Sequence, residues 1–352
     1  MNQTLLPVDI VLAPEWWAKN TELTFDRDFF FHPLKRVESE QRMEKELYAR
    51  WGKYGLGEHH AEKRPEVGAV HLAAGYLLSE MLGCEVNYSE NHPPQVLAAN
   101  REDYAVDVDA AFHSPAYKEF VKLTESLKQT YGHLTGDVNF GGVLNIALDL
   151  FGQNLFMGMM LQPDDVKVAF NNIASVIDRF TGSVFAETGS TSISVTRLVR
   201  HLAKPVFLHS ECSHTMISTE DYDALLKEYD VNWNQSKSPF GIHYCGNDPH
   251  RYAETFASLP HLDFLDLGWG GDVKQLRAQL PNTFFSLRLS PVEIVNQSND
   301  EIRETITRLV TESANPYLTG VCCINMDDQV SDDKIETILQ TVADLRAEVL
   351  AK

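Results

Sequence analysis

The chain has 352 residues, with 43% hydrophobic and 10% aromatic side chains, enough for one large barrel or two average domains with an ordinary packed core. Its formal charge of −20 and pI near 5.0 argue against non-specific binding to nucleic acid or to an anionic membrane, since both partners need a positive surface. No apolar run approaches the ~20 residues of a membrane span, and the N-terminus lacks the pattern of a signal peptide. Five scattered cysteines do not form a disulfide framework, so we expect a reduced, cytoplasmic protein.

The first 65 residues differ in character from the rest. They contain the aromatic clusters "EWW" (15–17) and "FDRDFFFHP" (25–33), and a predicted helix over 35–57. Aromatic clusters of this density commonly pack a cap onto a larger domain. We therefore expect residues 1–65 to form an N-terminal extension or cap, and residues 66–352 to form the main domain.

Short apolar runs alternate with helical segments through the main domain. Helices are predicted over 163–180, 298–314 and 331–352 from capping residues and from apolar side chains at helical spacing. The runs that read as strands are 67–75, 136–145, 182–190, 205–213, 240–247, 263–271, 283–291 and 320–328. Eight strands alternating with helices favour a (β/α)₈ TIM barrel over an open doubly wound sheet.

Reactive side chains gather where these runs end. Active sites of such barrels lie at the C-terminal ends of the strands. The residues found there are Glu187, His209, Glu211, Cys212, His214, His243, Cys245, Asp266, Arg288, Cys322, Cys323, Asn325 and Asp327. The sequence therefore predicts the functional site at this end of the barrel.

The stretch "FGIHYCGNDPH" (240–250) carries the most specific signal. Strand side chains alternate between faces, so His243 and Cys245 point the same way. A cysteine from the eighth run would complete a set of one imidazole and two thiolates, which favours zinc, with an open fourth position as in catalytic sites. If Asn325 and Asp327 face the mouth of the barrel, parity places Cys323 with them; we favour Cys323 as the third ligand and keep Cys322 as the alternative.

Further residues are candidates for catalysis or substrate binding, each with a structural alternative. Asp266 is a candidate fourth ligand, or else caps a helix or orients Trp269, with Glu211 the next candidate ligand. His209 and Glu211 share a strand face and bind substrate, relay a proton or serve as scaffold. Substrate contacts are assigned to Asp137, Asn139 and Arg288, with structural roles as the alternative, for Arg288 a salt bridge to Asp266.

The segments "FLHSECS", "GIHYCGN", "DLGWGGD" and "CCINMDD" resemble the uroporphyrinogen-decarboxylase superfamily, in its zinc-dependent, corrinoid-linked methyltransferase branch. The resemblance covers most of residues 60–352. It implies a (β/α)₈ barrel with zinc on His243, Cys245 and one of Cys322 or Cys323. The arginine-rich stretch that binds porphyrinogen carboxylates in the decarboxylases is missing here.

The resemblance implies a methyltransferase that uses zinc and the cobalamin of a separate corrinoid-binding protein, because the chain has no D-x-H-x-x-G motif of its own. The aromatic extension favours a methoxylated aromatic substrate, as in O-demethylases. The alternatives are a methylcobalamin:thiol methyltransferase, a metal-free decarboxylase and a non-catalytic binding partner. No nucleic acid or membrane partner is expected, and a homodimer is left open.

Overall fold

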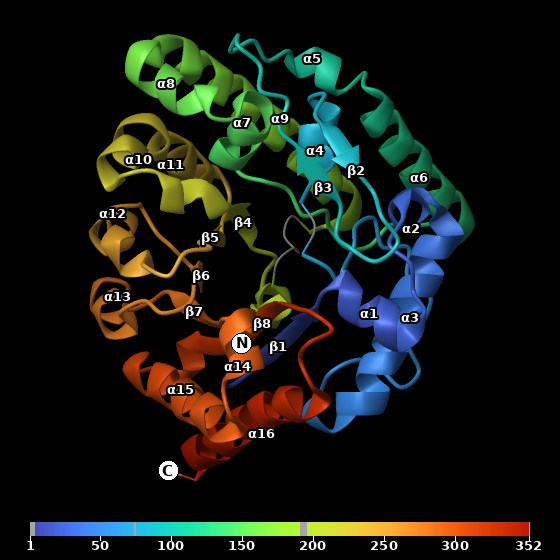
Figure 1. The fold of residues 1–352 in the computed structure, drawn as a ribbon, viewed down its shortest axis with the longest axis vertical. Helices are drawn as coiled ribbons and strands as arrows, with labels where there is room; N and C mark the ends of the chain where they lie inside the picture. Colours follow the sequence, from blue (N-terminus) through green and yellow to red (C-terminus); the bar gives the residue numbers. More distant parts are fainter. Residues whose placement is uncertain (1–3, 74, 191–195, 352) are drawn as a thin grey trace.

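The computed structural model describes residues 4–73, 75–190 and 196–351, and its centre is a curled parallel sheet. The sheet has six strands in the order β1-β8-β7-β6-β5-β4. These are β1 (Val8–Leu12), β4 (Phe207–Ser210), β5 (Phe240–His243), β6 (Phe264–Leu267), β7 (Phe284–Leu289) and β8 (Thr319–Met326). Figure 1 shows the strands around the middle of a ring and the helices outside them. A small antiparallel pair, β2 (Glu85–Asn87) and β3 (Gln95–Leu97), lies apart from this sheet.

The segments that begin at Glu66 and at Thr135 lie between β1 and β4 but do not form strands. Glu66 and Thr135 form an isolated parallel bridge, and Val67 N donates to Thr135 O at 3.0 Å. Gly142 N donates to Ser210 O at the end of β4, at 2.6 Å. The fold is thus mixed α/β with a half-barrel of parallel strands, consistent with a TIM-like arrangement. Eight strands are not formed among the residues that the structure describes.

Helices cover the outer face of the sheet. The predicted helices are confirmed, and Ser298 and Glu301 form a capping box at the start of one of them. The helices are α1 (Pro14–Thr21), α2 (Arg27–Phe31), α3 (Pro33–Trp51), α4 (Leu77–Met81), α5 (Val108–Ala111), α6 (Pro115–Tyr131), α7 (Val143–Phe151), α8 (Asn154–Leu161), α9 (Pro163–Thr188), α10 (Thr219–Leu225), α11 (Lys227–Ser236), α12 (Ala253–Ala257), α13 (Val273–Gln279), α14 (Pro291–Asn296), α15 (Asn299–Glu312) and α16 (Asp332–Leu350). Short 3-10 turns are η1 (Gly52–Tyr54), η2 (Arg197–His201), η3 (Cys212–Met216), η4 (Pro249–Tyr252) and η5 (Pro316–Leu318).

Three predicted strands are wrong. The run 182–190 is mostly the end of α9, where Glu187 is exposed and pairs with Lys128 at 2.5 Å, away from the strand ends. A short apolar run does not by itself separate a strand from the end of a long helix. The run 136–145 is not a strand and passes into α7, and the run 67–75 has no strand assignment over its described residues, position 74 lying outside them.

The N-terminal segment contributes to the sheet itself. Strand β1 pairs with β8 in parallel, with Val8 opposite Val321 and Asp9 opposite Cys322. The aromatic side chains that follow are buried in the main hydrophobic cluster; they include Trp16, Trp17, Phe25, Phe29, Phe30 and Phe31. They pack as core, and residues 8–12 form an edge strand of the central sheet. A domain boundary at residue 65 stays a prediction.

A buried arginine, Arg197, connects strand β1 with the segment that follows Glu66. Arg197, on η2, donates hydrogen bonds to Asp9 Oδ1 and to the backbone carbonyl of Ile10. Its guanidinium also contacts His71 Nδ1. Burial opposes ionisation of Asp9, but the Arg197 guanidinium wins and lowers the pKa of that carboxyl. Breaking a buried pair leaves an uncompensated charge, so this contact fixes η2 across the gap in the sheet.

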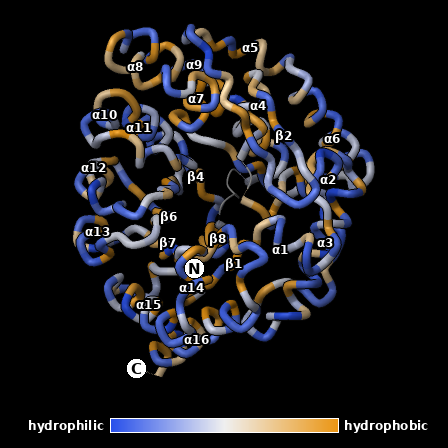
Figure 2. Tube along the Cα trace, viewed as in Figure 1, coloured by the Kyte–Doolittle hydropathy of each residue, from blue (hydrophilic) through white to orange (hydrophobic). Residues whose placement is uncertain are grey.

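The hydropathy of the trace follows this layering. Figure 2 shows hydrophobic residues along β8 and α7, and alternating hydrophobic and hydrophilic residues along the outer helices. Within the described residues, no single helix is long and apolar enough to cross a membrane; α7 and α8 meet that criterion only as a pair, bent by 109°.

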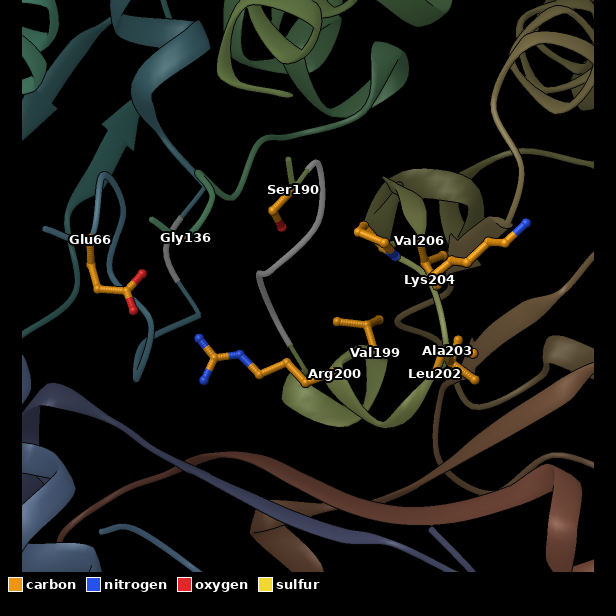
Figure 3. Close-up of a pocket in the computed structure, with 10 residues that line it drawn as sticks. Glu66, Gly136, Ser190, Val199, Arg200, Leu202, Ala203, Lys204 and Val206 are labelled. Carbon is orange, nitrogen blue, oxygen red and sulfur yellow. The ribbon is translucent and has the colours of Figure 1, made fainter. Parts of the chain in front are cut away.

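A cavity of about 310 Å³ lies at the N-terminal end of the strands, beside Gly136 and Val206. Figure 3 shows the Glu66 carboxylate and the Arg200 guanidinium directed into this space. Glu66 is 7% exposed, and none of the described residues hydrogen-bonds its Oε2. Burial raises the pKa of Glu66 to about 7, and burial likewise raises that of nearby Asp137 to about 7.

The raised pKa of Glu66 predicts a stability that falls as pH rises. The folded state holds this proton more tightly than the unfolded chain, so its contribution is present below pH 4.5 and is lost as pH rises to about 7. We expect Glu66→Gln to be about 3 kcal/mol more stable than the wild type at pH 8, with little difference at pH 4. Urea unfolding at both pH values measures this, with exposed Glu348→Gln as the control; an equal effect at both pH values would contradict it.

Candidate metal centre

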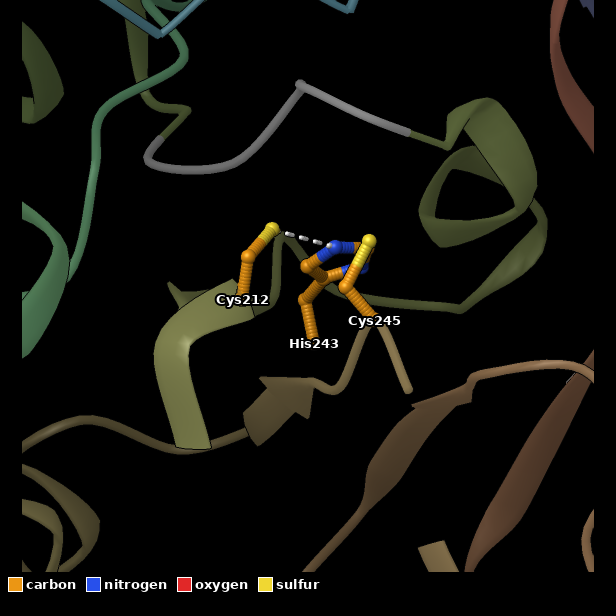
Figure 4. A group of neighbouring side chains, drawn as sticks. All are labelled: Cys212, His243 and Cys245. Atoms are coloured by element: carbon orange, nitrogen blue, oxygen red, sulfur yellow. Dashed lines mark hydrogen bonds between the residues drawn. The ribbon is translucent and has the colours of Figure 1, made fainter. Parts of the chain in front are cut away.

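The ends of β4 and β5 bring two cysteines and a histidine together. His243 is the last residue of β5, Cys245 follows two residues later, and Cys212 lies two residues beyond the end of β4. One ligand atom from each of the three side chains lies within 4.8 Å of the others. Figure 4 shows the two sulfur atoms on either side of the His243 ring. The predicted pairing of His243 with Cys245 is thus present, with Cys212 as the third member.

The imidazole of His243 is held in one orientation. The ring is fully buried, and its Nδ1 hydrogen-bonds to Asp266 Oδ2 on β6. Strand register causes this contact, because His243 and Asp266 are partners in the parallel ladder. Burial opposes the charged imidazole, but Asp266 raises the pKa of His243. Since Nδ1 is occupied, Nε2 faces the thiols, 3.3 Å from Cys212 Sγ.

The two thiols differ electrostatically. The hydrogen bond with Cys212 lowers the pKa of Cys245, and His243 and Arg288 lower it further against the effect of burial. Arg288 Nη1 lies 3.5 Å from Cys245 Sγ. The same sulfur–sulfur contact raises the pKa of Cys212, and burial adds to it. Both shifts favour the thiolate form of Cys245 over that of Cys212.

The donor set fits a soft divalent ion. In a tetrahedral zinc site the ligand atoms lie about 3.5–4 Å apart, which is compatible with three atoms within 4.8 Å of one another. Two sulfurs and one imidazole nitrogen favour zinc over magnesium or calcium. The His243–Asp266 contact is the carboxylate–histidine arrangement that orients metal-binding imidazoles. Three protein ligands leave one coordination position for another molecule.

The cysteines of β8 lie elsewhere. Cys323, the favoured third ligand, packs in the main hydrophobic cluster with its Sγ 3.5 Å from Leu289 O, so the geometry does not support that assignment. Asn325 has a φ of 57°, in the left-handed region, which interrupts the strand alternation used to place Cys323 at the mouth. Cys322 lies on the inner face with Phe264 and Phe284, opposite Arg288 in the strand register. It is close to this site but not within the group of three.

Asp266 and Arg288 each contact one residue of the candidate metal group, and a ligand role for Asp266 and a substrate contact by Arg288 stay predictions. Asp266 Oδ2 orients His243, while its Oδ1 is buried without a hydrogen bond among the described residues. Arg288 contacts Cys245 Sγ, and no salt bridge to Asp266 is formed within the described chain, although the Asp266 charge raises the pKa of Arg288. The Arg288 guanidinium also lies over Trp269, 5.6 Å from the ring centroid.

Glu211 and His209 connect β4 to neighbouring helices. Glu211 accepts from Leu144 N at 2.8 Å and Asn145 N at 3.0 Å, at the first turn of α7. Burial raises the pKa of Glu211 to about 7. His209 Nδ1 bonds to Asp230 Oδ1 at 2.7 Å, and a Cβ on Gly142 would collide with both His209 and Glu211. These contacts are those of a buried scaffold; catalytic roles for the two residues stay predictions.

Asp137 and Asn139 are not part of the group formed by Cys212, His243 and Cys245. Asp137 bonds to Val138 N and to Ser190 Oγ, at 2.7 and 3.2 Å. Asn139 is 7% exposed, and its Oδ1 has no hydrogen-bond partner among the described residues. The structure does not bring either residue into the group of metal ligands, and substrate contact by them stays a prediction.

Cys212 is the residue that the sequence reasoning did not select as a ligand. It was placed among the strand-end residues, but the third ligand was sought on the eighth run. The sequence signal for Cys212 is its distance from the strand end. Ser210 and His243 are paired across β4 and β5, and Cys212 and Cys245 each follow two residues later.

Comparison with known proteins gives the fold. Neither the family models nor the curated proteins contain a match to the chain. Among solved structures, a methyltransferase from Methanosarcina mazei aligns over 97% of this chain and 94% of its own, with 14% identity and a TM-score of 0.63. A B12-independent methionine synthase from Shewanella sp. W3-18-1, in complex with selenomethionine, aligns over 99% and 100%, with 11% identity and a TM-score of 0.53. At these identities the similarity establishes the fold alone.

The orienting contact of Asp266 can be tested through metal affinity. We expect Asp266→Asn to weaken zinc binding about 10- to 100-fold, because the carboxylate that fixes the His243 ring is lost. Competition titration against a chelator measures the affinity. Asp327→Asn serves as the control, because Asp327 follows the end of β8 and its side chain, within the described chain, hydrogen-bonds to Gln329. Unchanged affinity in the Asp266 variant would show that the contact does not support a metal.

Proposed function

We propose that the chain is a zinc-dependent methyltransferase that moves a methyl group between a small methylated substrate and the cobalamin of a separate corrinoid protein. The observation that carries the proposal is the group Cys212, His243 and Cys245 at the C-terminal ends of parallel strands. It stands in a fold that also occurs in proteins named as a methyltransferase and a methionine synthase. In barrels of parallel strands this end carries the active site.

Each residue of the site has a distinct task in this proposal. Bound zinc would supply a Lewis acid that stabilises a substrate thiolate, or polarises the substrate oxygen or nitrogen that carries the methyl group. His243 and Cys245 hold the ion, and Asp266 keeps the imidazole nitrogen directed at it. Arg288 places a buried positive charge beside Cys245 and so favours its thiolate.

The third ligand, which is the second sulfur of the set, is assigned to Cys212, because its Sγ lies within 4.8 Å of the other two ligand atoms. Cys322 is the second candidate, since it faces the inside of the sheet opposite Arg288. Cys323 faces the outer helices and serves as a matched control. Replacing each cysteine in turn separates these assignments.

The nature of the methyl donor is a further part of the proposal. A methoxylated aromatic was suggested by the aromatic extension, but Trp16, Trp17 and Phe30 are at most 3% exposed and belong to the core. The extension therefore gives no support for an aromatic ligand, and a methyl ether is kept as one donor among those to be tested. A thiol acceptor is the second candidate, favoured by the two-sulfur, one-nitrogen ligand set, which suits thiolate coordination.

The proposal is tested by metal analysis followed by cobalt spectroscopy. We expect about one zinc per chain, and conversion between cob(I)alamin and methylcobalamin when a methoxybenzoate donor or a thiol acceptor is added. Cys245→Ala should lose both zinc and methyl transfer, because a primary ligand is removed, whereas Cys323→Ala should keep both. Zinc retained at full stoichiometry in a His243→Ala/Cys245→Ala double variant would refute the ligand assignment, and zinc without any turnover would favour a binding role.

A further inference from the structure

Cys212 and Cys245 occupy matching positions, each two residues beyond the end of one of two neighbouring parallel strands, β4 and β5. Ser210 and His243 are partners in the ladder between β4 and β5, and Glu211 N continues it by donating to His243 O at 3.2 Å. Each cysteine follows two residues later. Neighbouring strands lie about 4.8 Å apart, which falls inside the range of Cα separations, about 4.4–6.8 Å, that a disulfide can join.

The two thiols are also close and reachable. Their Sγ atoms lie within 4.8 Å of each other, and both cysteines are free and partly exposed. The other three cysteines, Cys84, Cys322 and Cys323, are buried. The pair at the end of β4 and β5 therefore combines proximity with access for a small reagent.

We propose that Cys212 and Cys245 are an oxidation site, in which a disulfide between them and a bound metal ion exclude one another. The oxidant is a low-molecular-weight disulfide. The Cys245 sulfur attacks it, forming a mixed disulfide and releasing one small thiol. The Cys212 sulfur then attacks the Cys245 sulfur of the mixed disulfide, forming the Cys212–Cys245 bond and releasing the second thiol.

The reaction balances without another reagent. Two electrons pass from the protein thiols to the small disulfide, and the two protons leave on the released thiols or to solvent. The product has no thiolate at either position, and the thiolate is the form of cysteine that binds metals. Oxidation thus removes both sulfurs from the candidate metal centre, leaving His243 alone, and a bound metal in turn shields both sulfurs from attack.

The test uses the full-length chain and oxidised glutathione. After incubation, non-reducing peptide mapping of the metal-free protein should show the Cys212 and Cys245 peptides linked and two hydrogen atoms lighter. The zinc-loaded protein should not form this linked product. Dithiothreitol should remove the link and restore zinc binding.

Variants keep the result interpretable. Cys212→Ser should stop at a mixed disulfide on Cys245, because the resolving thiol is absent, and Cys323→Ala should link as the wild type does. The proposal would be overturned if the metal-free wild-type protein formed only mixed disulfides. It would also be overturned if linkage were equal with and without zinc. The measurement needs no methyl transfer, so its failure is distinguishable from failure of the proposed function.

Discussion

The in-register pairing of β4, β5 and β6 is the constraint on which the candidate site depends. Ser210, His243 and Asp266 are successive partners across these three strands. That register sets the hydrogen bond between His243 and Asp266, and it brings Cys212 and Cys245 to equivalent positions just beyond the strand ends. A slip of one residue in any of these strands would turn the inward side chains outward. The arrangement of the candidate ligands is therefore a consequence of backbone pairing, not of a single loop.

The other half of the ring is held by different forces. Where ladder hydrogen bonds are lacking between β1 and β4, the contacts come from the Glu66–Thr135 bridge, from Gly142 N to Ser210 O, and from Arg197. The Arg197–Asp9 pair is buried on both sides, so it stabilises only as long as both partners are charged. The side that carries Cys212, His243 and Cys245 is thus the regular part of the fold, whereas the opposite side depends on specific polar contacts.

Part of this arrangement was accessible from the sequence. Strand parity correctly placed His243 and Cys245 on one face, and capping residues located the helices over 163–180, 298–314 and 331–352. Parity failed for Cys323, because Asn325 adopts a left-handed conformation that interrupts the alternation. Asparagine adopts this conformation more readily than most residues, but the sequence does not show at which asparagine it occurs. The run 182–190 was misread because helix and strand patterns overlap over short apolar stretches. Strand β1 was missed although its sequence VDIVL is a β-branched apolar run typical of a strand, because residues 1–65 were assigned to a cap and its partner β8 lies more than 300 residues away.

The central claim is that His243 and Cys245 hold a metal ion at the end of β5, together with one further cysteine. X-ray absorption at the zinc edge tests it most directly, because sulfur and nitrogen neighbours scatter differently. The account predicts two sulfur ligands and one imidazole nitrogen for the zinc-loaded chain. Cys245→Ser, loaded with zinc at a concentration high enough to offset its weakened affinity, should show one sulfur fewer. A spectrum with only oxygen and nitrogen neighbours, or one that the substitution leaves unchanged, would contradict it.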